Sequence, residues 1–426
     1  MLFQYSIKNI TTRPLSSGLS VLLMAVSIMI IVLANLTMSQ LSSKFNENAN
    51  KVDLVVGSKG SRMQLVLCNV FHIDQPTGNI PIKSVQFIEN HPFVSLAVPI
   101  SLGDNYKKFR IVGTRASFIN DLYKAKINEG KIFEKSLEVV LGSKVAKELD
   151  LNIGSTFTGS HGIGESIHDH GDFEYEVVGI LEQTGEVIDQ LLLTPLESVW
   201  DVHPDDHQKG TFELSKNKKD THEHHHDHHH DHDHHHDHGH QHEKSSNEIT
   251  SLLVKYNSPR GKFTLPGSIN KKSELMAAEP AIEIQQLFEL IQPAVDILIR
   301  LSWIIFGLAM ISVFITLLNS MKDRKYEIAM MRAGGASSKK IFISVIFESI
   351  IISLIGSFLG VVLGHILMQL LSGLVLSNYN YDFSGFLFYP VELLFILGSV
   401  FIGMISALYP AYAAYKINIA QTLKQS

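Results

Sequence analysis

The chain has 426 residues, of which 45% are apolar, and a formal net charge of −6 with histidine counted as neutral. That length allows two or three domains. The single cysteine, Cys68, excludes an intrachain disulfide, and nothing in the composition indicates a nucleic-acid-binding protein.

The first 39 residues predict a surface helix followed by a membrane span. Residues 1–16 form an amphipathic pattern, with apolar residues recurring at helical spacing up to Pro14, and we expect this helix on the cytoplasmic membrane surface. The apolar run at 17–39 is long enough to cross a bilayer. Its core is too long for a signal peptide and no small-residue cleavage site follows it, so we expect an uncleaved helix.

Residues 40–296 alternate strand and helix patterns and predict a large α+β domain between the first and second spans. We expect strands at 52–56, 93–100, 109–113, 138–141, 173–181, 189–194 and 249–256. We expect helices at 143–149, with Ser143 as the N-cap, at 195–202 and at 280–292. A region of this size can bury a core of its own.

A histidine-rich insert at about 205–247 interrupts this domain. From His222 to Glu243 there are 14 histidines, six acidic residues and no apolar residue, so we expect a disordered loop. Imidazole and carboxylate together favour zinc, nickel or copper over magnesium or calcium. The candidate ligands are His222, His224, His225, His226, His228, His229, His230, His232, His234, His235, His236, His238, His240 and His242. The alternative is a solvated spacer that binds no metal.

A second histidine cluster precedes the predicted strand at 173–181. His168 and His170 flank Asp169 and form a further candidate metal pair, for which the alternative is a polar surface hairpin. Metal binding needs neutral imidazole, so we expect the affinity of the tract between His222 and Glu243 for metal to fall below about pH 6.

Three further spans are predicted at 297–321, 341–371 and 391–415. The segment 322–340 contains six Lys or Arg residues, whereas the loop 372–390 contains none. Because positive loops stay in the cytoplasm, the segment 322–340 and both termini, including the tail 416–426, are predicted to be cytoplasmic. The 40–296 region and the 372–390 loop are then extracytoplasmic.

The predicted spans contain few ionisable residues. Gly356, Gly360 and Gly364 recur every fourth residue, which lets another helix approach closely, either inside the subunit or at a dimer or gating interface. Glu348 and His365 are too few to indicate an ion path. Asp296 and Arg300, one turn apart at the outer edge of the second span, are expected to pair.

The sequence does not indicate an enzyme. It has no G-x-x-x-x-G-K-[ST] loop for nucleotide phosphates, no H-E-x-x-H motif and no supported Ser/His/Asp or Cys/His arrangement. We therefore expect no catalytic residue and no catalytic cofactor. Zinc or another divalent ion in the histidine-rich loop is the only bound group that the sequence indicates.

Several segments resemble the MacB/FtsX-type ABC transporter permeases, the type VII or mechanotransmission kind. Residues 326–336 resemble the family's EIA-x-x-RA-x-GA segment, and residues 410–424 resemble its C-terminal pattern, although Ile419 stands where proline is usual. The segments 6–10, 142–146 and 177–181 resemble further family signposts. The similarity extends over nearly the whole chain, and the arrangement of one span, a large domain and three spans agrees with it.

The resemblance implies a homodimer in the plasma (inner) membrane that works with a separate cytoplasmic ABC ATPase subunit. The segment 322–340 would be the coupling helix that contacts the ATPase, through Arg324, Glu327, Ile328, Met330, Met331 and Arg332. A periplasmic adaptor or a metal-binding protein would be a further partner. The histidine-rich tract has no counterpart in the family pattern.

Two functions of different classes follow. The first is a permease subunit that couples ATP hydrolysis in its partner to export or to extracytoplasmic mechanical work, linked to zinc or another divalent metal. The second is a membrane scaffold that regulates an envelope enzyme without transport. A free-standing metal carrier is disfavoured because the spans offer few metal ligands.

Overall fold

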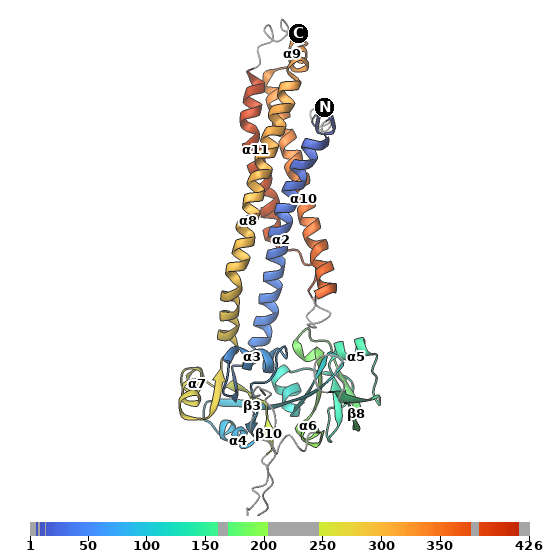
Figure 1. Cartoon of the computed structure of the whole chain (residues 1–426), viewed down its shortest axis with the longest axis vertical. Helices are drawn as coiled ribbons and strands as arrows, with labels where there is room; N and C mark the ends of the chain where they lie inside the picture. Colours follow the sequence, from blue (N-terminus) through green and yellow to red (C-terminus); the bar gives the residue numbers. More distant parts are fainter. Residues whose placement is uncertain are drawn as a thin grey trace, which may run out of the picture. The chain divides into compact units, whose positions relative to one another are not determined.

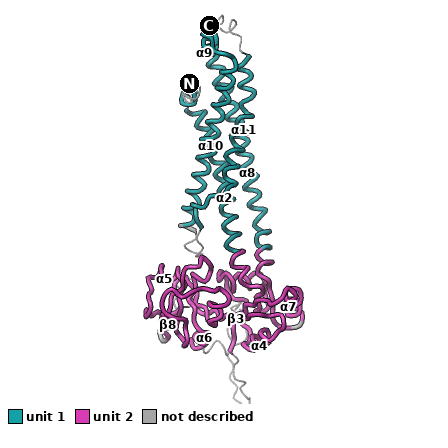
Figure 2. The backbone as a smooth tube through the Cα atoms, turned by 180° about the vertical axis from the view of Figure 1, so that it is seen from behind, with its two compact units in different colours: residues 1–45, 285–426 teal, residues 46–284 magenta. Residues whose placement is uncertain are grey.

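The computed structural model describes residues 6, 9–12, 14–160, 169–202, 247–375 and 383–416. The chain divides into two compact units (Figure 2). The first, here called the helical unit, comprises residues 1–45 and 285–426. The second, here called the sheet unit, comprises residues 46–284.

The helical unit is built from long helices that run side by side (Figure 1). These are α2 (Pro14–Ala49), α8 (Pro280–Asp323), α10 (Ser338–Val375) and α11 (Pro390–Tyr415), with the short α9 (Lys325–Ala333) between α8 and α10. All four long helices are apolar enough to cross a membrane. Each of the four predicted spans lies within one of them. A helix satisfies its backbone hydrogen bonds internally, which is the condition for crossing a bilayer.

The helical unit packs small and apolar side chains inward and leaves many large apolar side chains outside. Its buried cluster joins Met24, Ile28 and Val32 of α2 to side chains of the other long helices. On α8, Ile304, Leu308 and similar residues are more than half exposed. A helix that is apolar on its outer face as well as its inner face is expected where lipid replaces water.

The sheet unit is a mixed sheet covered by short helices. In the described residues its strand order is β12-β1-β11-β3-β4-β9-β6-β8-β5, and β7 pairs with β3 and β8. A second small sheet pairs β10 with β2. The strands are β1 (Leu54–Ser58), β2 (Ile80–Pro81), β3 (Val94–Tyr106), β4 (Phe109–Thr114), β5 (Ile127–Gly130), β6 (Glu138–Leu141), β7 (Thr156–Ser160), β8 (Asp169–Leu181), β9 (Leu191–Pro195), β10 (Glu248–Ile249), β11 (Ser251–Tyr256) and β12 (Leu275–Ala278).

The 13-residue strand β3 connects two hydrophobic cores. Its first half pairs with β11 and its second half with β4, with an irregular register between Leu102 and Asn105. One core lies under α4 (Lys83–Glu89) and α7 (Pro259–Lys272) and includes Leu54 and Val254. The other includes Phe109 and Tyr175, together with Val145 of α5 (Ser143–Leu149). The remaining helices are α3 (Arg62–Val70), α6 (Leu196–Val202), η1 (Phe118–Tyr123) and η2 (Val187–Gln190).

The predicted fold class, four apolar helices with an α+β domain between the first and second, is confirmed. Seven predicted strands coincide with β1, β3, β4, β6, β8, β9 and β11. The N-cap prediction was wrong: Gly142 occupies that position, and Ser143 is the first residue of α5. The strand predicted from residue 189 begins at Leu191, because Asp189 lies in η2.

The sequence patterns gave no signal for the helices α3, α4 and α7, or for the strands β2, β5, β7, β10 and β12. All five of these strands are only two to five residues long. Strands of this length carry too few alternations to be recognised from periodicity alone.

Candidate functional site

The segment 322–340, which the resemblance implied to be a coupling helix, contains a short helix with sharply defined ends. α8 ends at Asp323, Arg324 occupies the N-cap position, and α9 runs from Lys325 to Ala333. After α9 the backbone turns at Gly335, whose φ of +99° is a conformation that favours glycine. Glu327 lies in the first turn and Arg332 in the last, which is the favourable arrangement for the helix dipole.

The two faces of α9 differ in exposure. Ile328 and Ala329 are buried in the helical unit, and Met331 packs against the same apolar cluster. Tyr326 is 47% exposed and Met330 is 56% exposed. Of the apolar residues predicted to contact a partner, Met330 is therefore the one on the outer surface, and Ile328 and Met331 hold α9 in place.

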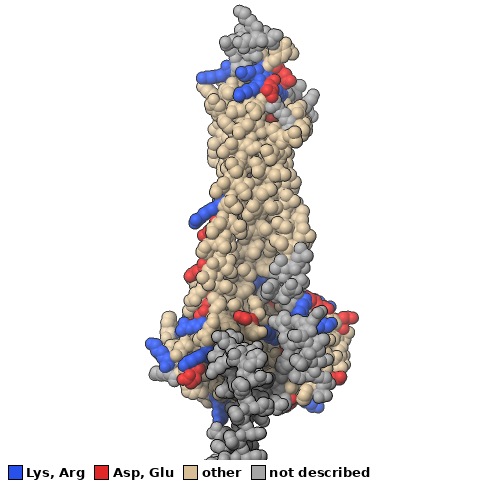
Figure 3. Space-filling model, in the orientation of Figure 1, with Lys and Arg blue, Asp and Glu red and all other residues tan. Residues whose placement is uncertain are grey.

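Charged side chains lie at the start of α9. Arg324 Nε donates to Glu327 Oε2 at 3.1 Å. In the space-filling view, Lys and Arg side chains gather at the end of the helical unit that carries α9, above a long uncharged flank (Figure 3). The exposed Met330 thus belongs to a segment, 322–340, that contains six Lys or Arg residues, a composition suited to contact with another protein.

A cavity of about 550 Å³ lies against the inner face of α9. Its walls include Met321, Ile328, Met331, Ile341 and Glu348. The described part of the N-terminal segment also reaches this region: Asn9 lines the cavity, and the buried Ser6 donates from Oγ to the carbonyl oxygen of Ser344 at 3.2 Å.

The three glycines of α10, Gly356, Gly360 and Gly364, form the surface against which α2 packs. A Cβ added at Gly356 would lie 2.9 Å from Met24 Cβ, and one at Gly360 would lie 2.7 Å from the carbonyl oxygen of Ala25. A Cβ at Gly364 would lie 2.9 Å from Val32 Cγ1. The close approach that these glycines permit is thus made within one subunit.

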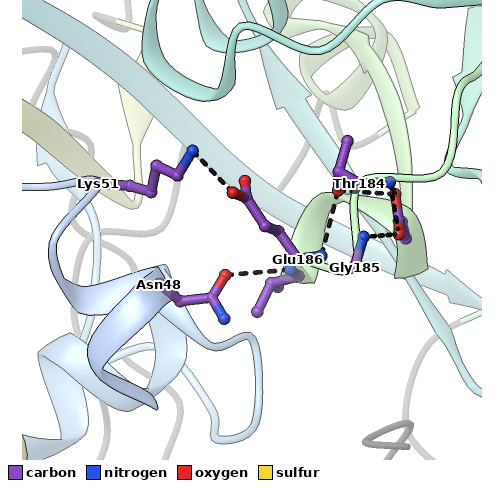
Figure 4. A network of polar contacts seen from close by, with 7 residues as sticks. Asn48, Lys51, Thr184, Gly185 and Glu186 are labelled. Atoms are coloured by element: carbon purple, nitrogen blue, oxygen red, sulfur yellow. Dashed lines mark hydrogen bonds and ion pairs between the residues drawn. The ribbon is translucent and has the colours of Figure 1, made fainter. Parts of the chain in front are cut away.

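The end of α2 is attached to a loop of the sheet unit (Figure 4). Asn48 Oδ1 accepts from the backbone N–H of Val187 at 3.0 Å, and Lys51 Nζ lies 2.7 Å from Glu186 Oε1. The buried carboxylate of Asp189 fixes that loop by accepting from the backbone N–H groups of Thr184 and Gly185. Sequence patterns did not reveal this contact, because it joins residues about 140 positions apart.

Two pairs of polar residues lie in the long helices. Asp296 accepts from Gln292 Nε2 at 2.8 Å, and in the described part of the chain no ion pair joins it to Arg300, so the predicted pairing was wrong. His365 and Glu392 are both buried and lie 2.8 Å apart, from Nε2 to Oε2.

Cys68 packs in the sheet unit as an ordinary buried residue. It is fully buried, and Arg110 Nη1 lies 3.6 Å from its Sγ. Burial raises the pKa of the Cys68 thiol to about 11, with Arg110 opposing the rise. Burial also lowers the pKa of the nearby His72 to about 3, and the charge of Arg110 adds to that shift. A thiol that stays protonated is not a reactive nucleophile at neutral pH.

The predicted metal ligands fall at or beyond the limits of the described structure. The histidines from His222 to His242 and His168 lie outside the described residues, and for His170 only the backbone, in β8, is described. Among the described residues, no group of three or more His, Cys, Asp or Glu side chains is arranged to hold a metal ion.

Two protein families match the chain by sequence. The model of the MacB-like periplasmic core domain matches residues 17–219, and the model of the FtsX-like permease C-terminal region matches residues 299–419. Among curated proteins, no sequence matches.

Two solved structures are similar to part of the chain. One is the periplasmic region of MacB from Actinobacillus actinomycetemcomitans, with 14% identity, a TM-score of 0.33, and coverage of 58% of this chain and 98% of that chain. The other is the extracellular domain of the noncanonic ABC-type transporter YknZ from Gram-positive bacteria. It shows 11% identity, a TM-score of 0.30, and coverage of 53% and 98%.

Proposed function

The chain belongs to the MacB/FtsX-type ABC transporter permeases, and we propose that it is the membrane subunit through which a separate cytoplasmic ATPase drives export or mechanical work outside the membrane. The observation that carries this proposal is the two-faced helix α9. Its inner face packs on the helical unit beside a cavity, and its outer face exposes Met330 in a segment that contains six Lys or Arg residues. Such a helix can be displaced by a partner protein and can transmit that displacement to α8 and α10.

We further propose that the protein resides in the plasma membrane with both termini and α9 in the cytoplasm. The six basic residues of 322–340, against none in 372–390, support this orientation. The sheet unit would then lie outside and receive movement through α2, whose end contacts the loop around Glu186.

A homodimer is the proposed assembly. On α8 an exposed apolar stripe recurs at alternating spacings of four and three residues: Ile297, Leu301, Ile304, Leu308, Ile311 and Ile315. This spacing is that of a helix seam which packs against a second helix. A second copy of the chain would cover part of it and lipid the rest. Chemical cross-linking of the protein in membranes tests the dimer, and a purely monomeric product would contradict it.

Substitution of Met330 tests the docking surface. We expect Met330→Asp to weaken association with the ATPase about tenfold or more, because a central apolar contact typically contributes over 1 kcal/mol. The measurements are co-purification of the ATPase subunit and its ATP hydrolysis rate. The matched control is Phe263→Asp on α7, which also places a carboxylate at an exposed apolar site, 82% exposed. Normal co-purification with Met330→Asp would reject the docking surface. Met331 is less suitable for this test, because its substitution would also unseat α9.

The second candidate function, a scaffold that regulates an envelope enzyme, shares the same fold and the same ATPase contact. Capture of a cell-wall hydrolase by the full chain, without any substrate moved by the complex, would favour it over export.

A link to metal is a separate proposal, supported by the 14 histidines and six acidic residues between His222 and Glu243. We expect the full-length chain to bind several zinc ions loosely at pH 7.5 and to lose most of this binding near pH 5.5, where imidazole is protonated. Calorimetry with zinc, on the intact chain and on a variant with every histidine of the tract replaced by asparagine, measures it. Equal heats from the two proteins would remove the metal from the proposal.

A further inference from the structure

Residues 383–385, which precede α11, are held by side chains from two helices. Ser384 N–H donates to Gln40 Oε1 at 2.8 Å, and Gln40 Nε2 donates to the carbonyl oxygen of Ser384 at 2.9 Å. Gly385 N–H donates to Gln369 Oε1 at 2.9 Å, and Ser372 Oγ donates to the carbonyl oxygen of Phe383 at 2.6 Å. Side chains thus satisfy consecutive backbone groups that have no sheet or helix partner.

The buried pair His365 and Glu392 closes the same arrangement. His365 Nδ1 lies 2.7 Å from the carbonyl oxygen of Gly385. A carbonyl oxygen only accepts, so Nδ1 carries a proton and donates. Nε2 then faces Glu392 Oε2 at 2.8 Å with one proton between them. The other oxygen, Glu392 Oε1, accepts from the backbone N–H of Tyr389 at 3.1 Å, which attaches the start of α11.

The close fit leaves little freedom for residues 383–385 to move by themselves. A Cβ at Gly385 would lie 2.4 Å from the backbone oxygen of His365, and the ring of Phe388 lies 4.2 Å from that of His365, between centroids. Gln40 is 3% exposed, so water does not compete for its two hydrogen bonds. Residues 383–385, Gln40, Gln369, His365 and Glu392 are here called the clasp.

The clasp joins two kinds of helix. α10 and α11 begin and end within the helical unit, whereas α2 continues for nine residues beyond Gln40, to Ala49, and leads into β1. A displacement of residues 383–385 therefore acts on α2 through the amide of Gln40, about 12 Å along the helix from Asn48 at 1.5 Å per residue. Asn48 is the residue that holds the loop at Val187.

We propose that Gln40 is a positioning residue that makes α2 move with α10 and α11, so that movement started at α9 reaches the helix that enters the sheet unit. This role rests on the proposed mechanical function. The clasp then does more than stabilise a loop. The ATPase would displace α10 and α11 by way of α9, and the clasp would transmit that displacement to α2.

The test uses the full chain in lipid nanodiscs, purified with its ATPase subunit, and the variant Gln40→Leu. Amide hydrogen exchange is followed with and without a non-hydrolysable ATP analogue, at Ser384 and at residues 184–189. We expect Gln40→Leu to speed exchange at Ser384 about tenfold, since a buried hydrogen bond contributes about 1 to 1.5 kcal/mol. We also expect it to abolish the nucleotide-dependent change at 184–189, while ATP hydrolysis stays within about twofold of the unsubstituted protein.

Two further variants separate this role from loop stability. Ser372→Ala removes a hydrogen bond to residues 383–385 but from α10, and it should keep the response at 184–189. In its ionised form, Gln40→Glu still accepts from Ser384 N–H but has no hydrogen to donate to the Ser384 carbonyl, and it should give an intermediate response if Gln40→Leu fails to fold.

Different results would contradict the role of Gln40 and the proposed mechanical function. A nucleotide response that survives in Gln40→Leu, or that is lost equally in Ser372→Ala, overturns the role of Gln40 and leaves the proposed function standing. A complex without any nucleotide response at 184–189 in the unsubstituted protein overturns the mechanical function itself, and the role of Gln40 with it.

Discussion

Large and small side chains are distributed in opposite ways in the helical unit and the sheet unit. In the sheet unit large side chains fill the interior: Phe109, Ile111 and Tyr175 are almost completely buried. In the helical unit the tightest contacts are made by residues with little or no side chain, such as Gly360 against Ala25, while many large side chains face outward. The difference indicates two solvents, because water drives apolar groups inward whereas lipid does not.

The largest effect that would test this contrast is a deletion in the sheet core. Phe109→Ala should destabilise the sheet unit by about 3–5 kcal/mol, since it removes transfer energy and leaves a cavity. Thermal unfolding monitored by near-ultraviolet circular dichroism measures it. Phe263→Ala, at a side chain that is 82% exposed, is the control and should change little. Equal shifts in the two variants would show that the sheet unit lacks the core described here.

The reactivity of Cys68 tests burial in the sheet unit through its chemistry. A rise of the thiol pKa from 9.0 to about 11 reduces the thiolate at pH 8 about 100-fold. Alkylation by iodoacetamide should therefore be slow in the folded protein, should speed up about tenfold per pH unit below pH 11, and should become fast in SDS. Mass spectrometry follows the adduct. Fast alkylation of the folded protein at pH 8 would mean that α3 opens readily.

A glycine substitution tests the close approach in the helical unit. Gly360→Leu should destabilise the protein by about 1–3 kcal/mol or more, because its Cβ would lie 2.7 Å from a backbone oxygen that cannot move aside. Gly398→Leu on α11 is the matched control, since an added Cβ there meets nothing within 4 Å. Melting temperatures in detergent compare the two. If Gly398→Leu lowered the melting temperature more than Gly360→Leu, the glycines of α10 would not be the main packing surface of α2.

The smallest expected effect concerns surface charge. Lys59 and Glu274 lie 3.3 Å apart, but the side chains are 52% and 97% exposed. Water screens such a pair, so Lys59→Ala should leave the melting temperature of the sheet unit unchanged within about 1 °C. A clear decrease would indicate that polar surface contacts share the stability attributed here to the core.

Part of the candidate site could be read from the sequence. The segment 326–336 resembled a family pattern, and the structure places it in a short helix, α9, that ends at Ala333 before the turn at Gly335. Which residues of α9 are buried and which are exposed could not be predicted in the same way, because α9 is nine residues long and both of its faces carry apolar residues. Only the position of α8 and α10 determines that Ile328 is buried and Met330 is exposed.

The sequence by itself determined the number of apolar helices, the place of the large domain between the first two, and most of its longer strands. These features depend on local periodicity and on runs of about 20 apolar residues, which act through neighbours along the chain. The tertiary structure decided the contacts between distant residues: Gln40 with Ser384, Asn48 with Val187, and the glycines of α10 with α2. Such contacts depend on how whole helices approach one another, and no pattern within a single segment encodes that approach.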